Sequence, residues 1–140
     1  MKVLVVVDMQ NDFIDGALGT KEAELIVSKV QQKIENYRSN NDVIIFTRDT
    51  HFENYLETQE GKNLPVKHCI KGEWGWEIVD ELNPHCILIK KPFYIVDKPT
   101  FGCVDIWKKW KNNFFAKLVN EKDVEVTFCG TCTDICVVSN

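Results

Sequence analysis

A cysteine near the end of the sequence is the residue best suited to chemistry. Residues 130–137 read Gly-Thr-Cys-Thr-Asp-Ile-Cys-Val and follow the apolar run at 124–129. This order predicts a strand, a turn led by glycine, and a helix that carries Cys136 in its first turns. The positive end of a helix dipole favours the thiolate, the form of cysteine that attacks a carbonyl carbon. Cys136 is therefore a candidate nucleophile, and a buried structural thiol is the alternative.

Two further residues could complete an acyl-transfer site around this thiol. Asp8 follows the apolar residues 3–7, and Lys98 lies in the segment Asp-Lys-Pro-Thr-Phe-Gly. A carboxylate can accept the thiol proton and later activate water, and a lysine beside both groups favours their charged forms. The backbone N–H groups of Cys132 and Cys136, at the predicted helix start, could bind the oxyanion of a tetrahedral intermediate.

Each of these assignments has a plainer alternative. Asp8 could cap a turn at the end of its strand, and Lys98 could be a solvated loop residue. Lys90 and Lys91 compete with Lys98 for any role that a lysine plays.

A second group of residues has the composition of a metal site. Asp49 and His51 lie two residues apart, and His68 follows later in the same long segment. Two imidazoles and a carboxylate suit Zn²⁺, Fe²⁺ or Mn²⁺, with water or substrate at the open positions. The alternative is that both histidines are ordinary polar loop residues.

The elements that must position these residues alternate along the chain. Apolar, β-branched runs predict strands, and apolar residues at helical spacing predict helices, with Thr20 as a cap of the first. The predicted strands are residues 3–7, 43–47, 86–90, 94–96 and 124–129; the predicted helices are 22–38, 76–82 and 103–119; residues 48–75 are a predicted loop. This alternation indicates an α/β fold with a mainly parallel sheet, in which chemistry gathers at the carboxyl ends of the strands.

Length, charge and composition limit the other possibilities. The 140 residues form one predicted domain, 1–140, with six cysteines and a net charge of −4. No basic cluster stands out, which argues against nucleic acid, and no apolar run approaches the roughly 18 residues of a membrane helix. The apolar run at 3–7 is too short for a signal peptide, so we expect a cytoplasmic protein with free thiols.

Four separated segments resemble the isochorismatase-like cysteine hydrolases, and within them the nicotinamidase/pyrazinamidase branch. The segments are Val-Val-Asp-Met-Gln-Asn-Asp-Phe (6–13), Thr-Arg-Asp-Thr-His (47–51), Leu-Pro-Val-Lys-His-Cys-Ile-Lys-Gly (64–72) and Gly-Thr-Cys-Thr-Asp-Ile-Cys-Val (130–137). They follow the family's order and extend over the whole chain.

The resemblance implies a three-layer α/β/α fold and a small-molecule amidase. Asp8, Lys98 and Cys136 would be its catalytic triad, and Phe13 would line the substrate pocket. Cys136 would form a thioester, release ammonia and be freed by hydrolysis. The family domain continues beyond its nucleophile, so we expect this chain to lack a C-terminal strand and helix.

The resemblance also implies a bound divalent metal, with zinc expected, and a fourth ligand. Glu60 is the expected ligand and Glu57 is the alternative. A homo-oligomer is expected.

Three other functions stay open at this stage. The first is an isochorismatase or an N-carbamoyl or ureido amidohydrolase of the same fold. The second is a thiol redox protein, because Cys129 and Cys132 form a C-x-x-C between a strand and a helix. The third is a binding protein without catalysis.

Overall fold

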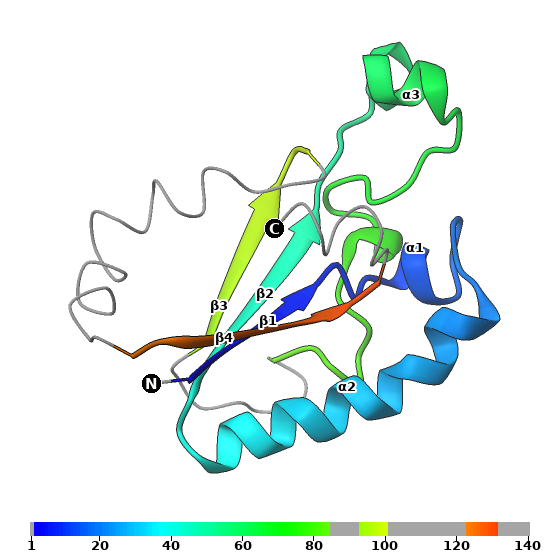
Figure 1. Cartoon of the computed structure of the whole chain (residues 1–140). Helices are drawn as coiled ribbons and strands as arrows, with labels where there is room; N and C mark the ends of the chain where they lie inside the picture. Colours follow the sequence, from blue (N-terminus) through cyan, green and yellow to red (C-terminus); the bar gives the residue numbers. More distant parts are fainter. Residues whose placement is uncertain (1, 85–92, 101–122, 132–140) are drawn as a thin grey trace.

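A parallel β-sheet organises the chain, and its order explains why distant residues meet. The computed structural model describes residues 2–84, 93–100 and 123–131. Within them lie the strands β1 (Lys2–Val7), β2 (Val43–Asp49), β3 (Phe93–Lys98) and β4 (Glu125–Gly130). The strands are all parallel, in the order β3-β2-β1-β4 (Figure 1). The predicted α/β class and parallel sheet are therefore confirmed.

The strand register places the predicted site residues at one edge of the sheet. Val7 pairs with Thr47 on β2 and with Gly130 on β4, and Asp49 pairs with Lys98 on β3. Strands β1, β2 and β3 are slightly longer than the sequence predicted, and the extension includes both Asp49 and Lys98, whereas β4 is displaced by one residue.

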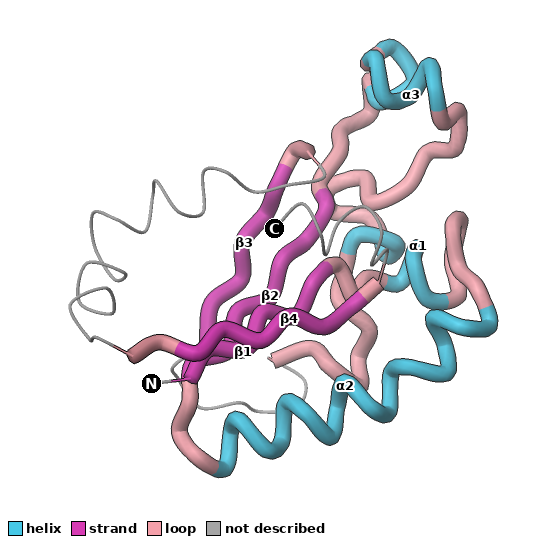
Figure 2. Tube along the Cα trace, viewed as in Figure 1, coloured by secondary structure: helices cyan, strands magenta, loops and turns pink. Residues whose placement is uncertain are grey.

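The central strands are buried on both faces, as their continuous apolar sequences predict. Leu4 and Val6 belong to the core beneath the long helix α2 (Lys21–Ser39), whereas Val3, Val5 and Val7 belong to a separate cluster. Alternate residues of a strand point to opposite faces, so this division follows directly from the sequence. Figure 2 shows α2 running along one side of the sheet.

Helix α2 forms where the apolar spacing predicts it. The Thr20 side chain accepts a hydrogen bond from the Ala23 N–H and caps the first turn. The inward side chains Val30, Ile34 and Tyr37 are buried against the sheet. No helix in the described residues is both long and apolar enough to cross a membrane.

The predicted helix at 76–82 is wrong. The chain there forms a short 3₁₀ turn, η2 (Trp74–Trp76), and then an extended segment that ends in turns. Ile78 bridges to Gln10, and the Val79 N–H donates to the Met9 carbonyl at 3.0 Å. Pairing with a distant segment buries Ile78, Val79 and Leu82 without a helix.

Short helices that the sequence analysis did not predict lie near the edge of the sheet. Helix α1 (Asn11–Ile14) follows β1. The segment predicted as a loop holds η1 (Tyr55–Glu57) and α3 (Gln59–Asn63), which extend beyond the sheet in Figure 1.

Several sequence predictions lie outside the described residues. They are the strand at 86–90, the helix at 103–119, and the helix start that carries Cys132 and Cys136.

Candidate active site and metal centre

Asp8 lies at the edge of the sheet formed by the carboxyl ends of the strands. It directly follows β1, is fully buried and has a φ of 50°, an uncommon conformation for a residue with a side chain. The Thr47 hydroxyl donates to Asp8 Oδ1 at 2.6 Å, and the Asp8 N–H donates to the Thr47 carbonyl at 3.2 Å. The Thr131 hydroxyl donates to the Asp8 carbonyl at 2.8 Å. A contact from β2 therefore holds the carboxylate, and contacts from β2 and from Thr131 after β4 hold the Asp8 backbone.

Gly130 allows the end of β4 to approach the end of β1. Its φ is 144°, and a Cβ there would lie 2.1 Å from the Val7 carbonyl oxygen. No other residue fits this position without moving the backbone. The close approach lets the Thr131 N–H donate to the Val7 carbonyl and brings Thr131 beside Asp8.

Lys98 is the ionic partner of Asp8. Its Nζ lies 2.6 Å from Asp8 Oδ2, and both side chains are excluded from solvent. Nζ also donates to the Thr100 carbonyl at 3.4 Å. Burial raises the pKa of Asp8, while the Lys98 charge and hydrogen bonds from Lys98 and Thr47 act in the opposite direction. A buried carboxyl group with a raised pKa and a fixed cation is suited to proton transfer.

A four-residue group beside this pair has the composition of a metal site. Asp49, His51, Glu60 and His68 each offer one ligand atom, and these atoms all lie within 4.8 Å of one another. His51 Nε2 lies 3.0 Å from Asp49 Oδ2, and His68 Nε2 lies 3.5 Å from the same oxygen. Glu60 Oε1 lies 3.4 Å from His51 Nε2.

Two buried oxygens in this group support a bound cation. Asp49 Oδ1 and Glu60 Oε1 accept no hydrogen bond from the described residues. Buried carboxylate oxygens without a partner are costly, and a metal ion would satisfy both. The Val66 carbonyl lies 2.7 Å from His68 Nδ1, so that nitrogen is the donor and Nε2 faces the carboxylates. The residues therefore fit a divalent metal.

The structure distinguishes the two candidates for the fourth ligand. Glu60 lies in α3 and joins the group, whereas Glu57 is exposed on η1 and lies outside it. The Thr58 side chain caps α3 by accepting from the Gly61 N–H and also donates to the Tyr55 carbonyl. This turn directs Glu60 toward the histidines.

Hydrogen bonds and charges within the metal group shift the pKa values of its members. Burial alone would raise the pKa of Asp49, but hydrogen bonds with His51 and His68 hold it well below its usual range. Burial opposes protonation of His68, yet its hydrogen bond with Asp49 leaves its pKa above the ordinary value of 6.5.

Aromatic rings enclose the histidines. The Tyr55 ring centroid lies 4.6 Å from that of His51 and 5.0 Å from that of His68, and the Phe13 centroid lies 5.6 Å from that of His68. The Tyr55 hydroxyl donates to the Leu64 carbonyl, and burial raises its pKa to about 12, so it stays a donor. Phe13 thus lies beside the metal group.

Three contributors to the site were not singled out from the sequence. Thr47 and Gln10 lie inside the matched segments, but nothing in their identity showed that Thr47 contacts Asp8 or that Gln10 contacts Asp49. Nothing in the sequence indicated a role for Tyr55 except that it lies between the predicted ligands His51 and Glu60.

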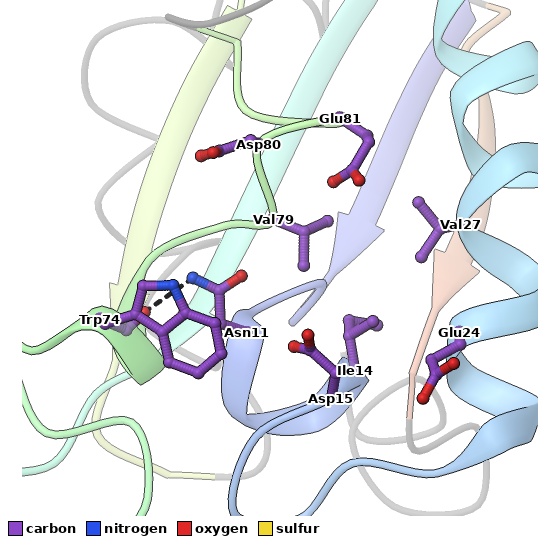
Figure 3. Close-up of a pocket in the computed structure, with 9 residues that line it drawn as sticks. All are labelled: Asn11, Ile14, Asp15, Glu24, Val27, Trp74, Val79, Asp80 and Glu81. Carbon is purple, nitrogen blue, oxygen red and sulfur yellow. Dashed lines mark hydrogen bonds between the residues drawn. The ribbon is translucent and has the colours of Figure 1, made fainter.

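Two pockets flank this region. One, of about 680 Å³, is lined in part by His51, Glu60, Leu64 and Thr100, and so opens beside the metal group. The other, of about 410 Å³, lies between α1, α2 and the segment at 79–81 (Figure 3). Its lining includes the carboxylates of Asp15, directly after α1, of Glu24 on α2, and of Asp80 and Glu81. Its lining includes neither Asp8 nor Lys98. In the same view Asn11 donates to the Trp74 carbonyl and joins α1 to η2.

The Cys129 thiol is poorly suited to redox chemistry. It lies in β4 and is partly buried, and burial raises its pKa to about 11. A thiol that stays protonated near neutral pH is a weak nucleophile for disulfide exchange.

The chain matches a known family over nearly its full length. The family model described as an isochorismatase domain matches residues 2–140. The chain belongs to the isochorismatase family. The predicted resemblance is therefore confirmed, and the relatives that it matches also support the nicotinamidase-like branch.

Three relatives illustrate the range of this match. The nicotinamidase of Saccharomyces cerevisiae is 28% identical, over 98% of this chain and 78% of its own length. The structure of N-carbamoylsarcosine amidase from Thermoplasma acidophilum has a TM-score of 0.75 at 27% identity, covering 99% of this chain and 72% of that one. The structure of pyrazinamidase from Pyrococcus horikoshii in complex with zinc has a TM-score of 0.70 at 28% identity, covering 97% and 73%.

Proposed function

We propose that this member of the isochorismatase family hydrolyses a small carboxamide, of the nicotinamide or pyrazinamide kind, to the acid and ammonia. The observation that carries the proposal is the buried Asp8–Lys98 pair, which lies at the same sheet edge as the metal group and the segment leading to Cys136. The yeast nicotinamidase and the Pyrococcus pyrazinamidase support this substrate class.

In the proposed reaction, Asp8 moves protons for Cys136. The Cys136 thiol gives its proton to Asp8, and its sulfur bonds to the amide carbon, whose oxygen becomes an oxyanion bound by the N–H groups of Cys132 and Cys136. Asp8 then returns the proton to the leaving nitrogen, which departs as ammonia and leaves a thioester. Asp8 next takes a proton from water, whose oxygen displaces the sulfur, and the proton returns to the thiolate.

Lys98 has an electrostatic role in this scheme. Its ammonium group lies 2.6 Å from Asp8, so it stabilises the carboxylate that accepts the proton. Burial opposes that charge and raises the pKa of Asp8, so burial and the Lys98 charge act on this carboxyl group in opposite directions. Phe13 would contribute an apolar wall to the substrate pocket.

Asp49, His51, Glu60 and His68 would hold the divalent metal. The ion would supply a Lewis-acid site for an atom of substrate or water. Two imidazoles with carboxylates are a donor set typical of zinc, and iron and manganese also accept it. The zinc complex of the Pyrococcus relative favours zinc.

An N-carbamoyl or ureido compound is the second candidate substrate. The similarity to N-carbamoylsarcosine amidase favours it, because that relative matches this chain with comparable identity and coverage. An ammonia-release screen over nicotinamide, pyrazinamide and N-carbamoylsarcosine, with protein loaded with zinc, iron or manganese, tests both candidates. Turnover of the aromatic amides with a clear metal dependence supports the proposal, and turnover of the N-carbamoyl compound alone contradicts it.

A further inference from the structure

A buried glutamine connects the segment that carries Asp8 with the backbone of Asp49 in the metal group. Gln10 lies two residues after Asp8, and its side chain is fully excluded from solvent. The Asp49 N–H donates to Gln10 Oε1 at 2.7 Å, and Gln10 Nε2 donates to the Asp49 carbonyl at 2.8 Å. The second amide hydrogen goes to the Trp76 carbonyl at 2.9 Å. The side chain thus uses both of its donors and one acceptor.

This pairing occurs where the main chain of β1 stops pairing with β2. The last register pair between the two strands is Val7 with Thr47, and the backbone then turns aside at Asp8 with its positive φ. On its other edge, Asp49 still pairs with Lys98 of β3. The Gln10 amide therefore contacts Asp49 as a neighbouring strand would, so that Asp49 is held on both sides.

We propose that Gln10 is a positioning residue for the metal centre, and that it fixes the ligand Asp49 relative to the strand end that carries Asp8. The inference rests on the proposed metal site. The Gln10 side chain hydrogen-bonds to main-chain atoms of Asp49 and Trp76, so it acts through the Asp49 backbone. An amide that pairs with both the N–H and the C=O of one residue restricts that residue's rotation, and hence the direction of its carboxylate.

A second contact from the same segment supports this assignment. The Asp12 carboxylate accepts a hydrogen bond from the Cys69 N–H at 2.8 Å, and Cys69 directly follows the ligand His68. Gln10 and Asp12 thus hold the backbone at or beside two different ligands. The segment after β1 positions the metal group as well as supplying Asp8.

Metal affinity of the metal-free protein tests the proposal without any substrate. Gln10→Glu keeps the side-chain shape but replaces both N–H donors with an oxygen that faces two carbonyls. We expect the dissociation constant for Zn²⁺, measured by chelator competition, to rise by about 10–100-fold. We also expect the visible absorption spectrum of the Co²⁺-loaded variant to change, because it reports ligand geometry. Gln32→Glu, which changes an exposed glutamine on α2 in the same way, should alter neither.

A second variant keeps the test decisive if Gln10→Glu folds poorly. Gln10→Asn retains the amide but is too short to reach Asp49, and it should weaken Zn²⁺ binding in the same direction. A lower urea midpoint with an unchanged Zn²⁺ affinity and Co²⁺ spectrum would overturn the proposal, because Gln10 would then be only structural. Failure of the wild-type chain to bind either metal would overturn both this inference and the proposed metal site.

Discussion

The Nζ atom of Lys98 lies 2.6 Å from Oδ2 of Asp8, and neither side chain is exposed to solvent. Asp8 directly follows β1 and Lys98 is the last residue of β3, and β2 lies between these two strands. The two residues meet because the parallel strands β1 and β3 end at the same edge of the sheet. Removing one partner would leave the other charge buried alone, which makes the pair accessible to experiment.

Lys98→Met should destabilise the protein and abolish amide hydrolysis. It leaves the Asp8 carboxylate buried without a cation, at a cost of about 3–5 kcal/mol in the free energy of unfolding. Asp8→Asn added to Lys98→Met should recover much of this stability but no activity, because the neutral pair cannot move a proton. Urea unfolding and ammonia release measure the two effects, and Lys29→Met on the exposed side of α2 is the control. Equal stability of Lys98→Met and wild type would contradict the account.

Thr47→Val should raise the pKa of Asp8. Burial already raises it, and the Thr47 hydrogen bond is one of the contacts that opposes burial, so its loss adds to the shift. The acid limb of the kcat/KM profile should move to higher pH, with a stability loss of about 1–3 kcal/mol. Thr127→Val removes a hydroxyl from β4 at the level of Leu4, far from the strand ends, and should leave the profile unchanged. An unaltered acid limb in Thr47→Val would argue against Asp8 as the proton acceptor.

The metal-free protein should lose stability as the pH rises through the pKa of His68. The folded-state pKa of His68 is raised above 6.5, against burial, by its hydrogen bond with Asp49. The stabilisation is therefore complete below pH 6.5 and is lost above the raised value. Zinc needs neutral His68, so the difference in Tm between zinc-loaded and metal-free protein should widen from about pH 6 to about pH 8. His68→Asn should remove most of this pH dependence; its persistence would assign the effect to other groups.

Gly61→Ala should weaken metal binding by displacing Glu60. A Cβ at Gly61 would lie 2.0 Å from the Tyr55 carbonyl oxygen, so the turn between η1 and α3 must open. The Zn²⁺ dissociation constant should rise by about 10–100-fold. Lys62→Ala, at an exposed position of the same helix, should change it little. An unchanged affinity in Gly61→Ala would mean that the metal does not depend on Glu60.

Local patterns in the sequence predicted the elements whose causes are local. Buried β-branched runs marked the strands, and Thr20 with its apolar stripe marked α2. The helix predicted at 76–82 failed because Ile78 and Val79 pair with Gln10 and Met9, which lie far away in the sequence. Spacing alone gives no information about such long-range pairing.

The site shows the same difference between features that local sequence predicts and features that depend on long-range contacts. Asp8, Lys98 and the two histidines were identified because they stand in recognisable segments. The choice of Glu60 over Glu57 depends on the turn that Thr58 caps, and the role of Gln10 depends on where β1 leaves β2. These features follow from the fold. The predicted catalytic roles, the homo-oligomer and the cytoplasmic location stay predictions.

Ammonia release from nicotinamide or pyrazinamide by metal-loaded protein, compared between wild type, Cys136→Ala and Cys129→Ala, tests the central claim most directly. The account predicts that Cys129→Ala retains most of the activity, because its thiol is protonated and plays no part. It predicts that Cys136→Ala loses roughly a thousandfold or more, because the proposed thioester forms on the Cys136 sulfur. Ammonia release by Cys136→Ala at the wild-type rate would contradict it.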